Sequence, residues 1–536
     1  MRQNFIDRVI AAVDPVRAAQ RMKARGQLAA GESIAAMMSA TSGTSTAESD
    51  ARGWNRWWSP SIRDASADSL RGLATDRARS RQLTRTNPIA ASAINTNAVR
   101  AVGTGLALSA QPHRATLGWT EEQARTWRQH VHAEFSLWAD SPDSDLHGVQ
   151  NFYDDQDLVL RSMLESGDCF TMLPDGERTP TMPYALRRQV LEADRVGNPN
   201  GGADTAEVSA GVRFNPNGRL DGYHVYRRHP GSIVSPGGGR FVGDWVSAVG
   251  ASGRRRILHH FKMLRPEQRR GLVYLGPVMQ LFKDLGTYTD AEVKAAVVSA
   301  FLTVFIETAA GVGPAPVHGL TETQAREGDI PMGPGMVVGL EPGEKANAVN
   351  PGRPNPAFGP FVDVVIDQLG AGTFIGREML MKKYNTSYVA ARAAFLDAWK
   401  HLLDLRTRMV RTYCQPIYET WMAEAVILGR VHAPGFFADP RLRWAYTRST
   451  WTGDSQGSIN PKDEVAAFRD AIDAKLVTRE RAEWELFGTD WSETYDTKKA
   501  EHVRLKGDDM LPAPKAGAAA PPQPTERQPA QQETTT

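Results

Sequence analysis

The residues most suggestive of catalysis lie in Gly453-Asp-Ser-Gln-Gly457, which matches the G-x-S-x-G pattern of a hydrolase nucleophile elbow. A serine in such an elbow needs an acidic residue and a histidine further along the chain, and His502 is the only later histidine. The alternating strands and helices of a hydrolase core are also missing around the pattern. We therefore interpret Gly453-Asp-Ser-Gln-Gly457 as a polar turn.

Other chemistry-bearing patterns also lack the context that they need. Gly370-Ala-Gly-Thr-Phe-Ile-Gly376 resembles a dinucleotide-binding loop, but a helical segment precedes it where a strand is required. The pairs His259-His260 and His130-x-His132 have no carboxylates or cysteines at ligand spacing, and no Walker A pattern occurs. The sequence therefore predicts no catalytic residue, no metal site and no cofactor, and we expect that the protein is not an enzyme.

Charge does not identify a partner for the chain as a whole. The formal net charge is +2 over 536 residues, although 15 Lys/Arg stand against 8 Asp/Glu in residues 1–100, and 7 against 2 in residues 381–414. A local basic excess of this kind can serve a polyanion such as DNA or RNA. An ordinary solvated surface explains the same counts, so charge alone leaves both interpretations open.

Compartment is indicated by the cysteines and by the apolar runs. Cys169 and Cys414 are far apart in the sequence, as is usual in a reducing cytoplasm. The longest apolar run, around Ala295–Ile306, is too short to span a bilayer, and the first residues contain no signal-peptide pattern. We therefore predict a soluble protein with no membrane contact.

The elements that must position any functional residue are predicted from periodicity and from capping signals. Residues 38–50 read as a flexible loop, and Asp68 and Asn87-Pro88 each begin a helix in residues 68–101. Short β-rich runs between Pro and Gly punctuation follow in residues 165–262. A helix from 277 to 307 would be about 46 Å long, and Gly286 kinks or splits it. A helix over 387–414 is kinked or ended by Pro416. The remaining predicted elements are helices over 119–138, 358–369, 461–475 and 478–486, strands over 336–340 and 442–447, and a disordered tail after Lys506.

Several segments, in this order along the chain, resemble the lambda-type tailed-phage portal family. Tyr388-Val-Ala-Ala-Arg392 stands where members of that family commonly have Tyr-Ser-Ser-Ala-Arg. The segments that carry the resemblance are Arg81-Gln-Leu-Thr-Arg-Thr-Asn-Pro-Ile-Ala-Ala-Ser-Ala-Ile with Val102-Gly-Thr-Gly-Leu, Glu165-Ser-Gly-Asp-Cys-Phe, His260-Phe-Lys-Met-Leu-Arg-Pro-Glu-Gln-Arg-Arg-Gly-Leu-Val-Tyr-Leu-Gly-Pro-Val with Asp284-Leu-Gly-Thr-Tyr-Thr-Asp-Ala-Glu, Pro334-Gly-Met-Val-Val-Gly-Leu-Glu-Pro-Gly-Glu, Asn385-Thr-Ser-Tyr-Val-Ala-Ala-Arg-Ala-Ala, and Ile459-Asn-Pro-Lys-Asp-Glu-Val-Ala-Ala with Leu476-Val-Thr-Arg-Glu and Phe487-Gly-Thr-Asp-Trp.

The resemblance implies an α+β portal fold that is assembled as a ring. Periodicity alone gives only an α+β protein with an interrupted helical hairpin. The domains that the resemblance implies are an N-terminal arm (1–60), a wing (61–275), a stem helix (276–307), a clip (308–356), a second stem helix (357–369), a tunnel loop (370–387), a long helix that returns to the wing (388–457), a helical crown (458–505) and a disordered tail (506–536).

The resemblance also implies a function and partners. The expected function is a channel for double-stranded DNA at one capsid vertex, formed by a ring of twelve subunits, with a separate motor that hydrolyses ATP. The expected partners are the large terminase subunit, a head–tail connector protein and the major capsid protein. The expected location is the virion, after assembly in the host bacterial cytoplasm. Another capsid-assembly protein, such as a scaffold or minor head protein, and a nucleic-acid enzyme are the alternatives.

Two groups of basic residues are the candidate sites. Lys382, Lys383 and Arg377 lie in or beside the tunnel loop that the resemblance implies, where sparse mobile charge would suit DNA in transit. A second basic patch is predicted either to face packaged DNA or, as ring symmetry favours, to pair with acidic residues of a neighbouring subunit. This patch comprises Arg254, Arg255, Arg256, Arg269 and Arg270.

Overall fold

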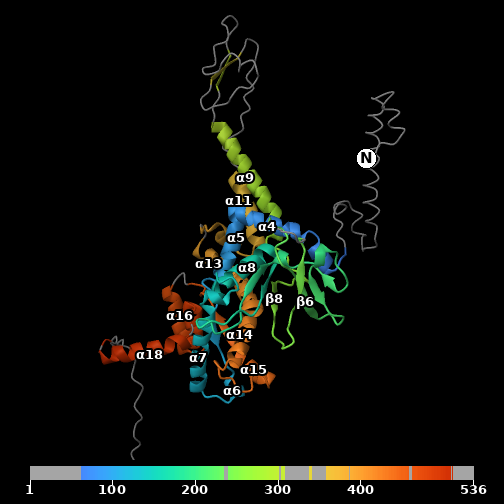
Figure 1. Cartoon of the computed structure of the whole chain (residues 1–536). Coiled ribbons are helices and arrows are strands. Elements are labelled where there is room, and N and C mark those ends of the chain that lie inside the picture. Colours follow the sequence, from blue (N-terminus) through green and yellow to red (C-terminus); the bar gives the residue numbers. More distant parts are fainter. Residues whose placement is uncertain are drawn as a thin grey trace, which may run out of the picture. The chain divides into compact units, whose positions relative to one another are not determined.

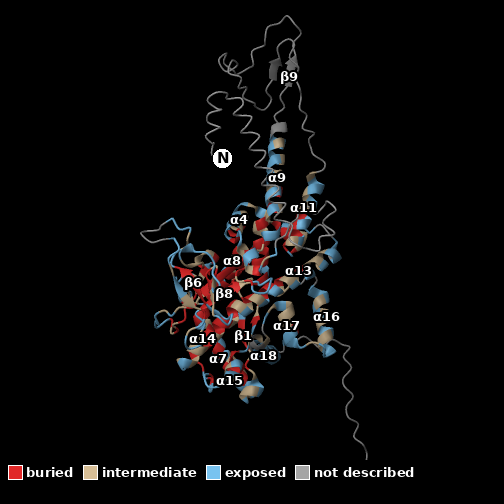
Figure 2. Cartoon of the chain, turned by 90° about the vertical axis from the view of Figure 1, so that its right-hand side faces the viewer, coloured by how far each residue is buried: buried red, intermediate tan, exposed pale blue. Residues whose placement is uncertain are grey.

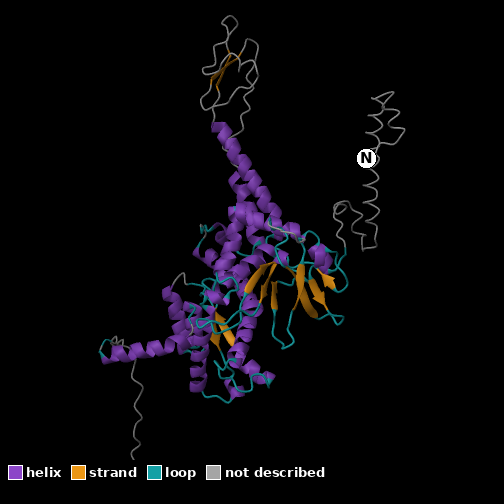
Figure 3. Cartoon of the chain, viewed as in Figure 1, coloured by secondary structure: helices purple, strands orange, loops and turns teal. Residues whose placement is uncertain are grey.

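The computed structural model describes residues 62–233, 240–300, 304–307, 337–340, 358–384, 387–457, 461–489, 491–508 and 510. Helices predominate in these residues, and the strands form small sheets (Figure 1, Figure 3), so the predicted α+β class is confirmed. The predicted N-terminal arm and the flexible loop at 38–50 lie outside the described residues, as do most of the predicted clip and residues 511–536 of the tail.

The first described helices are α3 (Ala65–Leu70), α4 (Leu73–Thr86) and α5 (Pro88–Ala101). The Asn87 side chain accepts hydrogen bonds from the backbone N–H groups of the second and third residues after it, and Pro88 occupies the first turn, so the predicted start of α5 is confirmed. Asp68 does not cap a helix. It lies inside α3, and its carboxylate forms an ion pair with Arg265 at 2.6 Å.

Two amphipathic helices, α7 (Glu121–Ala139) and α8 (Phe152–Ser166), build the main core. Capping boxes begin both of them, with Thr120 capping α7 and Asn151 capping α8. The predicted helix over 119–138 is therefore confirmed, and its apolar side chains at three- and four-residue spacing are buried (Figure 2). The buried apolar residues of α7 are Ala124, Trp127, Val131, Phe135, Trp138 and Ala139.

The strands predicted in the β-rich segment form two antiparallel sheets, with strand orders β3-β2-β8 and β4-β5-β6-β7. A small second core lies against both sheets and includes Phe170 of β2 and Tyr223 of β6, whose rings are 5.2 Å apart. The strands of this segment are β2 (Asp168–Met172), β3 (Gln189–Glu192), β4 (Val208–Ser209), β5 (Val212–Phe214), β6 (Leu220–Tyr226), β7 (Gly243–Ser247) and β8 (Ile257–Phe261).

The long helix is shorter than the sequence predicts. After a 3₁₀ turn at Gly276–Val278, helix α9 runs unbroken over Met279–Ala300, about 33 Å, and Gly286 does not split it. The prediction of helix as far as residue 307 is wrong, because Val304–Glu307 is strand β9. Its β-branched and aromatic residues suit an extended chain, and β9 pairs in parallel with β10 (Val337–Leu340), which confirms the predicted strand there.

The predicted helix over 358–369 is α11 (Phe358–Gly372), which packs against α9 (Figure 1). The ring of Tyr288 on α9 lies 5.7 Å from that of Phe358 and 5.0 Å from that of Phe361. The segment predicted as the tunnel loop is partly helical, because α12 (Gly376–Met381) lies within it. A tight turn thus joins α11 to α12.

The predicted long helix continues beyond Pro416. Helix α13 (Tyr388–Met409) passes into a π-helical turn at Val410–Cys414 and then into α14 (Gln415–Ile427). The Gln415 N–H donates to the Val410 carbonyl, which is the wider i→i+5 bond of a π turn. Proline has no N–H and cannot donate the usual α-helical hydrogen bond. Pro416 lies in the first turn of α14, directly after the π turn, where the missing N–H donor is tolerated.

The predicted strand over 442–447 is wrong, because helix α15 (Pro440–Thr447) occupies this segment. Asp439 accepts a hydrogen bond from the Arg441 N–H, and Pro440 fills the first turn, and this start signal outweighs the aromatic residues that follow. Strand β11 (Ser449–Thr452) comes next and pairs with β1 (Ala107–Ala110), which precedes the short helix α6 (Arg114–Leu117).

The predicted C-terminal helices are present. Thr478 caps the second of them, and none of the described side chains of the first is buried (Figure 2). They are α16 (Pro461–Asp473) and α17 (Arg479–Phe487), and a further helix that was not among the predicted ones, α18 (Trp491–Gly507), follows them. Among the helices of the described residues, none combines the length and the apolar character that a bilayer crossing requires.

Candidate functional site

The three residues predicted for a channel lie in α12 and directly after it. Arg377 is the second residue of α12, and its side chain reaches back to α11, where its guanidinium forms ion pairs with Asp363 and, at 3.3 Å, with Asp367. Two carboxylates of the same chain thus lie against its single positive charge. Of the three candidates, Arg377 therefore fits a role in holding the turn better than a role in binding a phosphate.

Lys382 and Lys383 differ from Arg377 in this respect. Lys382 ends α12 in the left-handed conformation (φ 54°), and both N–H groups of the pair point to the Glu378 carbonyl. Both side chains are exposed and form no ion pair with a described residue. The structure therefore places two adjacent ammonium groups, unpaired among the described residues, at the end of α12.

The predicted basic patch does not form one surface. Arg254 forms an ion pair with Asp175, whereas Arg255 and Arg256 are exposed. Arg269 is half-buried, with its guanidinium 4.1 Å from the centre of the Phe214 ring. Arg270 is only 2% exposed, so it is not part of any surface patch.

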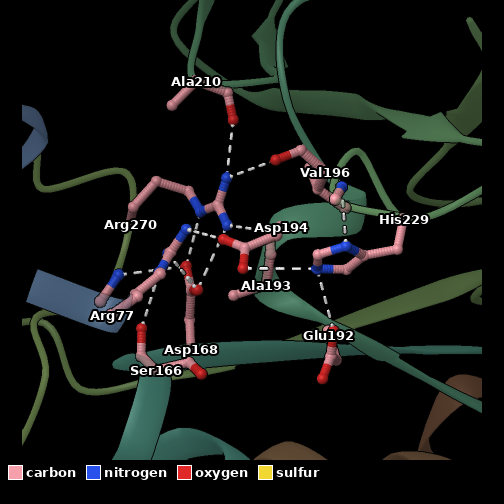
Figure 4. Close-up of polar contacts among 12 residues, drawn as sticks. Arg77, Ser166, Asp168, Glu192, Ala193, Asp194, Val196, Ala210, His229 and Arg270 are labelled. Atoms are coloured by element: carbon pink, nitrogen blue, oxygen red, sulfur yellow. Dashed lines mark hydrogen bonds and ion pairs between the residues drawn. The ribbon is translucent and has the colours of Figure 1, made fainter. Parts of the chain in front are cut away.

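Arg270 belongs instead to a buried charge cluster around Asp168, the first residue of β2 (Figure 4). The Asp168 carboxylate accepts hydrogen bonds from Arg270 Nε and Arg77 Nη2, both at 2.6 Å, from His259 Nε2 at 3.1 Å and from the Gly271 N–H at 3.2 Å. All four donors surround a side chain that is fully buried. Asp168 therefore serves as a shared counter-charge for two buried arginines, and Asp194 is a second acidic partner of Arg77.

The same two arginines tie separate parts of the fold together. Arg270 donates to the carbonyl oxygens of Ala193, Val196 and Ala210, at 2.7–2.9 Å. Arg77, on α4, donates to the Ser166 carbonyl at 2.8 Å. The cluster thus joins α4, the end of α8, the central strand β2 and the chain leading into the four-stranded sheet (Figure 4).

A second layer of charges surrounds this centre. Asp194 accepts hydrogen bonds from Arg81 at 2.5 Å and from Arg77 at 3.3 Å. His229 lies 3.1 Å from a carboxylate oxygen of Glu192 and 3.6 Å from one of Asp194. Figure 4 shows Glu192, Asp194 and His229 pointing toward one another beside the two central arginines. The arrangement is a structural ion network.

The pKa values in the cluster follow from burial and from the arginines. Burial alone would raise the pKa of Asp168, but the charges of Arg270 and Arg77 outweigh it and hold the pKa far below its ordinary value. His259 is stacked between Phe170 and Phe261, and its burial lowers its pKa despite the contact with Asp168. The neighbouring His260 is also buried, and this lowers its pKa to about 3.

We expect His260 to make the protein acid-labile. An unfolded histidine titrates near pH 6.5, so protons bind to the unfolded chain first as the pH falls, and stability that is present above pH 6.5 is lost below it. Between pH 7.5 and pH 5.0 the loss attributable to His260 is about 2 kcal/mol of unfolding free energy. Urea denaturation of the wild type and of His260→Gln at both pH values measures it.

In His260→Gln we expect a smaller fall in unfolding free energy between the two pH values, because glutamine does not titrate and can still contact Thr171, which lies 2.9 Å from His260 Nε2. His502→Gln, a change of an exposed histidine on α18, is the control and should behave as the wild type. Equal pH dependence in all three proteins would contradict the prediction.

The predicted polar turn Gly453–Gly457 lines a cavity of about 450 Å³ between α13, α16 and α17. Arg406 donates to the Asp454 carbonyl at 2.9 Å, so this turn is held by its backbone. Both cysteines are buried, and burial raises the pKa of each thiol. Within the described ranges, no three His, Cys, Asp or Glu side chains gather as metal ligands.

Sequence reasoning missed the Asp168 cluster, whose members come from residues about 90 to 100 positions apart. The one local signal is an acidic residue at the start of an otherwise apolar strand, which predicts a buried and therefore paired carboxylate.

The sequence matches the model of a protein family described as phage portal protein, lambda family, over residues 51–406. Portal protein B of Escherichia phage lambda is 24% identical over 491 residues, which cover 87% of this chain and 90% of that protein. The portal protein of Escherichia phage N15 is 24% identical over 496 residues, with the same coverage. Among solved structures, a chain from the neck of a native gene transfer agent particle matches at 14% identity and a TM-score of 0.36, over 77% of this chain and 98% of that chain.

Proposed function

This chain belongs to the lambda family of phage portal proteins, and on that premise we propose that it assembles into a ring of twelve subunits forming a channel for double-stranded DNA at one capsid vertex. The observation that carries the proposal is the family match over residues 51–406, together with relatives named portal proteins that align over nearly all of their length. Closed rings of identical subunits need only one repeated interface, which suits a single gene product.

We propose that the parts of the portal map onto the elements as follows. The wing comprises residues 61–275 and, after α13, the return through β11. The first stem helix is α9 with the 3₁₀ turn before it, and the second stem helix is α11. The residues between α9 and α11, which include β9 and β10, are the clip. The turn around α12 faces the channel, and α16, α17 and α18 are the crown. The parallel pairing of β9 with β10 supports this mapping, because it joins the start of the clip to a segment further along it.

We propose that DNA moves past Lys382 and Lys383, whereas Arg377 holds the turn that presents them. Ring symmetry would repeat the two lysines around the duplex. Each firm phosphate contact adds affinity through counterion release, so a few flexible ammonium groups attract DNA without arresting it. The role is passive and not enzymatic, and the ATP-hydrolysing motor would be a separate protein.

The proposal includes the predicted partners and location. The clip would dock the large terminase subunit and later a head–tail connector protein, and the wing would contact the major capsid protein. The protein would assemble in the cytoplasm of the host bacterium and remain in the virion. Coimmunoprecipitation with each of these proteins, with and without residues 308–336 replaced by a short linker, tests the clip assignment.

Electron microscopy of the purified full chain tests the proposed function. We expect rings with a central hole wide enough for duplex DNA. Monomers, or a shell lattice, would contradict the proposal and favour the alternative of a scaffold or minor head protein. Cleavage of DNA by the purified chain would favour the other alternative, a nucleic-acid enzyme.

A further inference from the structure

The part of the wing formed by α6 and α15 has an exposed surface. The two helices pack together (Figure 1), and Trp444 on α15 is 51% exposed. Beside it is a hollow of about 590 Å³ whose lining includes His113, Arg114 and Arg448. We call the exposed face formed by these four residues and Arg441 the α6–α15 surface.

This surface is held rigidly from below. The Gln111 N–H donates to the Arg448 carbonyl at 2.8 Å, and the His113 N–H donates to the Ala445 carbonyl at 3.0 Å, so the two segments run side by side. Beneath them Trp119 packs against Tyr446, with ring centres 5.6 Å apart. A fixed backbone of this kind can present side chains to a ligand at little cost in conformational entropy.

The charges of the α6–α15 surface are mostly positive and only partly balanced. Arg448 lies over the Trp444 ring at 5.3 Å, and the Arg441 side chain is exposed and forms no ion pair with a described residue. Arg114 is opposed by Glu121, at 2.9 Å, but that carboxylate is shared with Arg128.

The local acidic residue at the start of α15 does not offset these charges fully. One oxygen of the Asp439 carboxylate accepts a hydrogen bond from the Arg441 N–H at 2.8 Å, so this group is engaged in capping the helix. The ring of His113 lies 5.2 Å from that of Trp444, on the same exposed face. Cations interleaved with aromatic rings form a surface that suits a polyanion.

We propose that the α6–α15 surface binds the phosphate backbone of duplex DNA outside the channel. Arg441 and Arg448 would contact phosphates directly, and Trp444 would hold the guanidinium of Arg448 in position. The identity of the polyanion as DNA rests on the proposed function, because a portal meets duplex DNA in the capsid. An acidic protein would meet the same charges, and the experiment below separates the two.

The test uses closed circular duplex DNA, which cannot thread through a closed ring. We expect the full chain to bind labelled circles in a filter-binding assay at low salt. In Arg441→Glu/Arg448→Glu, affinity should fall at least tenfold. In Arg441→Ala/Arg448→Ala, the slope of log affinity against log salt should fall by about 2 for each subunit that contacts the DNA, because two phosphate contacts are lost.

The matched control is Arg219→Glu/Arg240→Glu, which makes the same charge change in the four-stranded-sheet subdomain and should bind circles as the wild type does. Trp444→Ala should weaken binding less than the double charge reversal. Circular dichroism of each variant establishes that it is folded.

The outcomes separate this inference from the proposed function. Loss of circle binding in the α6–α15 variants alone supports the inference, whether or not microscopy shows rings. Rings that bind no circles, or equal binding by the wild type and both α6–α15 double variants, overturn it and leave the channel proposal intact. Retention of an acidic protein by a wild type that binds no circles would likewise overturn it.

Discussion

Asp168→Asn is expected to lower the free energy of unfolding by about 3–5 kcal/mol, because it leaves the buried Arg270 without a counter-charge and leaves Arg77 only its longer contact with Asp194. Arg77 is 5% exposed and Arg270 2% exposed, so water cannot replace the lost carboxylate. Asparagine has nearly the same volume as aspartate, so the loss reports charge and hydrogen bonding and not a cavity. Urea denaturation followed by circular dichroism measures the change.

The control for this change is Asp244→Asn. Asp244 also forms an ion pair with an arginine, Arg227, but both side chains are more than half exposed, at 63% and 67%. An exposed pair of this kind contributes little to stability, because water screens the two charges. Similar losses in the two variants would contradict the assignment of Asp168 as the centre of a buried network.

The Asp168 cluster also predicts a second acid transition, separate from that of the histidines. The pKa of Asp168 is lower in the native state than in the unfolded chain, where it is about 3.9. Its contribution to stability is therefore fully present above about pH 4 and is lost as the pH falls below that value. In Asp168→Asn this part of the acid dependence should be missing.

Lys382→Glu/Lys383→Glu is expected to reduce the yield of DNA-filled particles at least tenfold when it replaces the wild type during phage assembly. The change alters the charge at the turn by four units in each subunit, and a ring would repeat that change around the duplex. Both residues lie outside ion pairs with described residues, so the reversal breaks no pair among them. The number of full and empty capsids, counted by electron microscopy, is the measurement.

Two comparisons make this result specific. Lys382→Ala/Lys383→Ala should give a milder effect, seen as altered packaged DNA length or retention. Arg219→Glu/Arg240→Glu, with the same charge change away from α12, should package normally. Unchanged DNA length, retention and yield in both lysine variants would exclude the channel role of this turn.

The sequence predicts most of the helices because their boundaries are marked locally. Asn87 before Pro88 and Thr120 before α7 are capping signals that need no information from the rest of the fold. Val304–Glu307 shows the limit of such reasoning, because a short apolar run suits a helix and a strand equally and only its pairing with β10 decides. Helix α15 shows the opposite case, because Asp439 before Pro440 is a local start signal for a helix that the prediction of a strand over 442–447 does not use.

The candidate sites also differ in whether their surroundings are set by local sequence or by tertiary packing. Lys382 and Lys383 could be found because they adjoin segments that resemble the family, and their exposure depends mainly on a local turn. Arg270 was misplaced because its environment depends on Asp168 and on carbonyl groups far away in the sequence. A pattern of arginines gives no indication of which one has a buried partner, since burial is set by tertiary packing.

The π-helical turn at Val410–Cys414 makes this part of the chain sensitive to length. The π turn contains one residue more than an α-helical turn, and this residue changes the direction in which the side chains of α14 point. The buried faces of α13 and α14 therefore point to the same core only when that residue is present. Deleting a single residue there would rotate α14 by about 100° relative to α13 and turn Trp421 away from the core. Insertions and deletions should therefore be selected against in this helix far more strongly than substitutions, and relatives that lack the extra residue should also lack a proline at the position of Pro416.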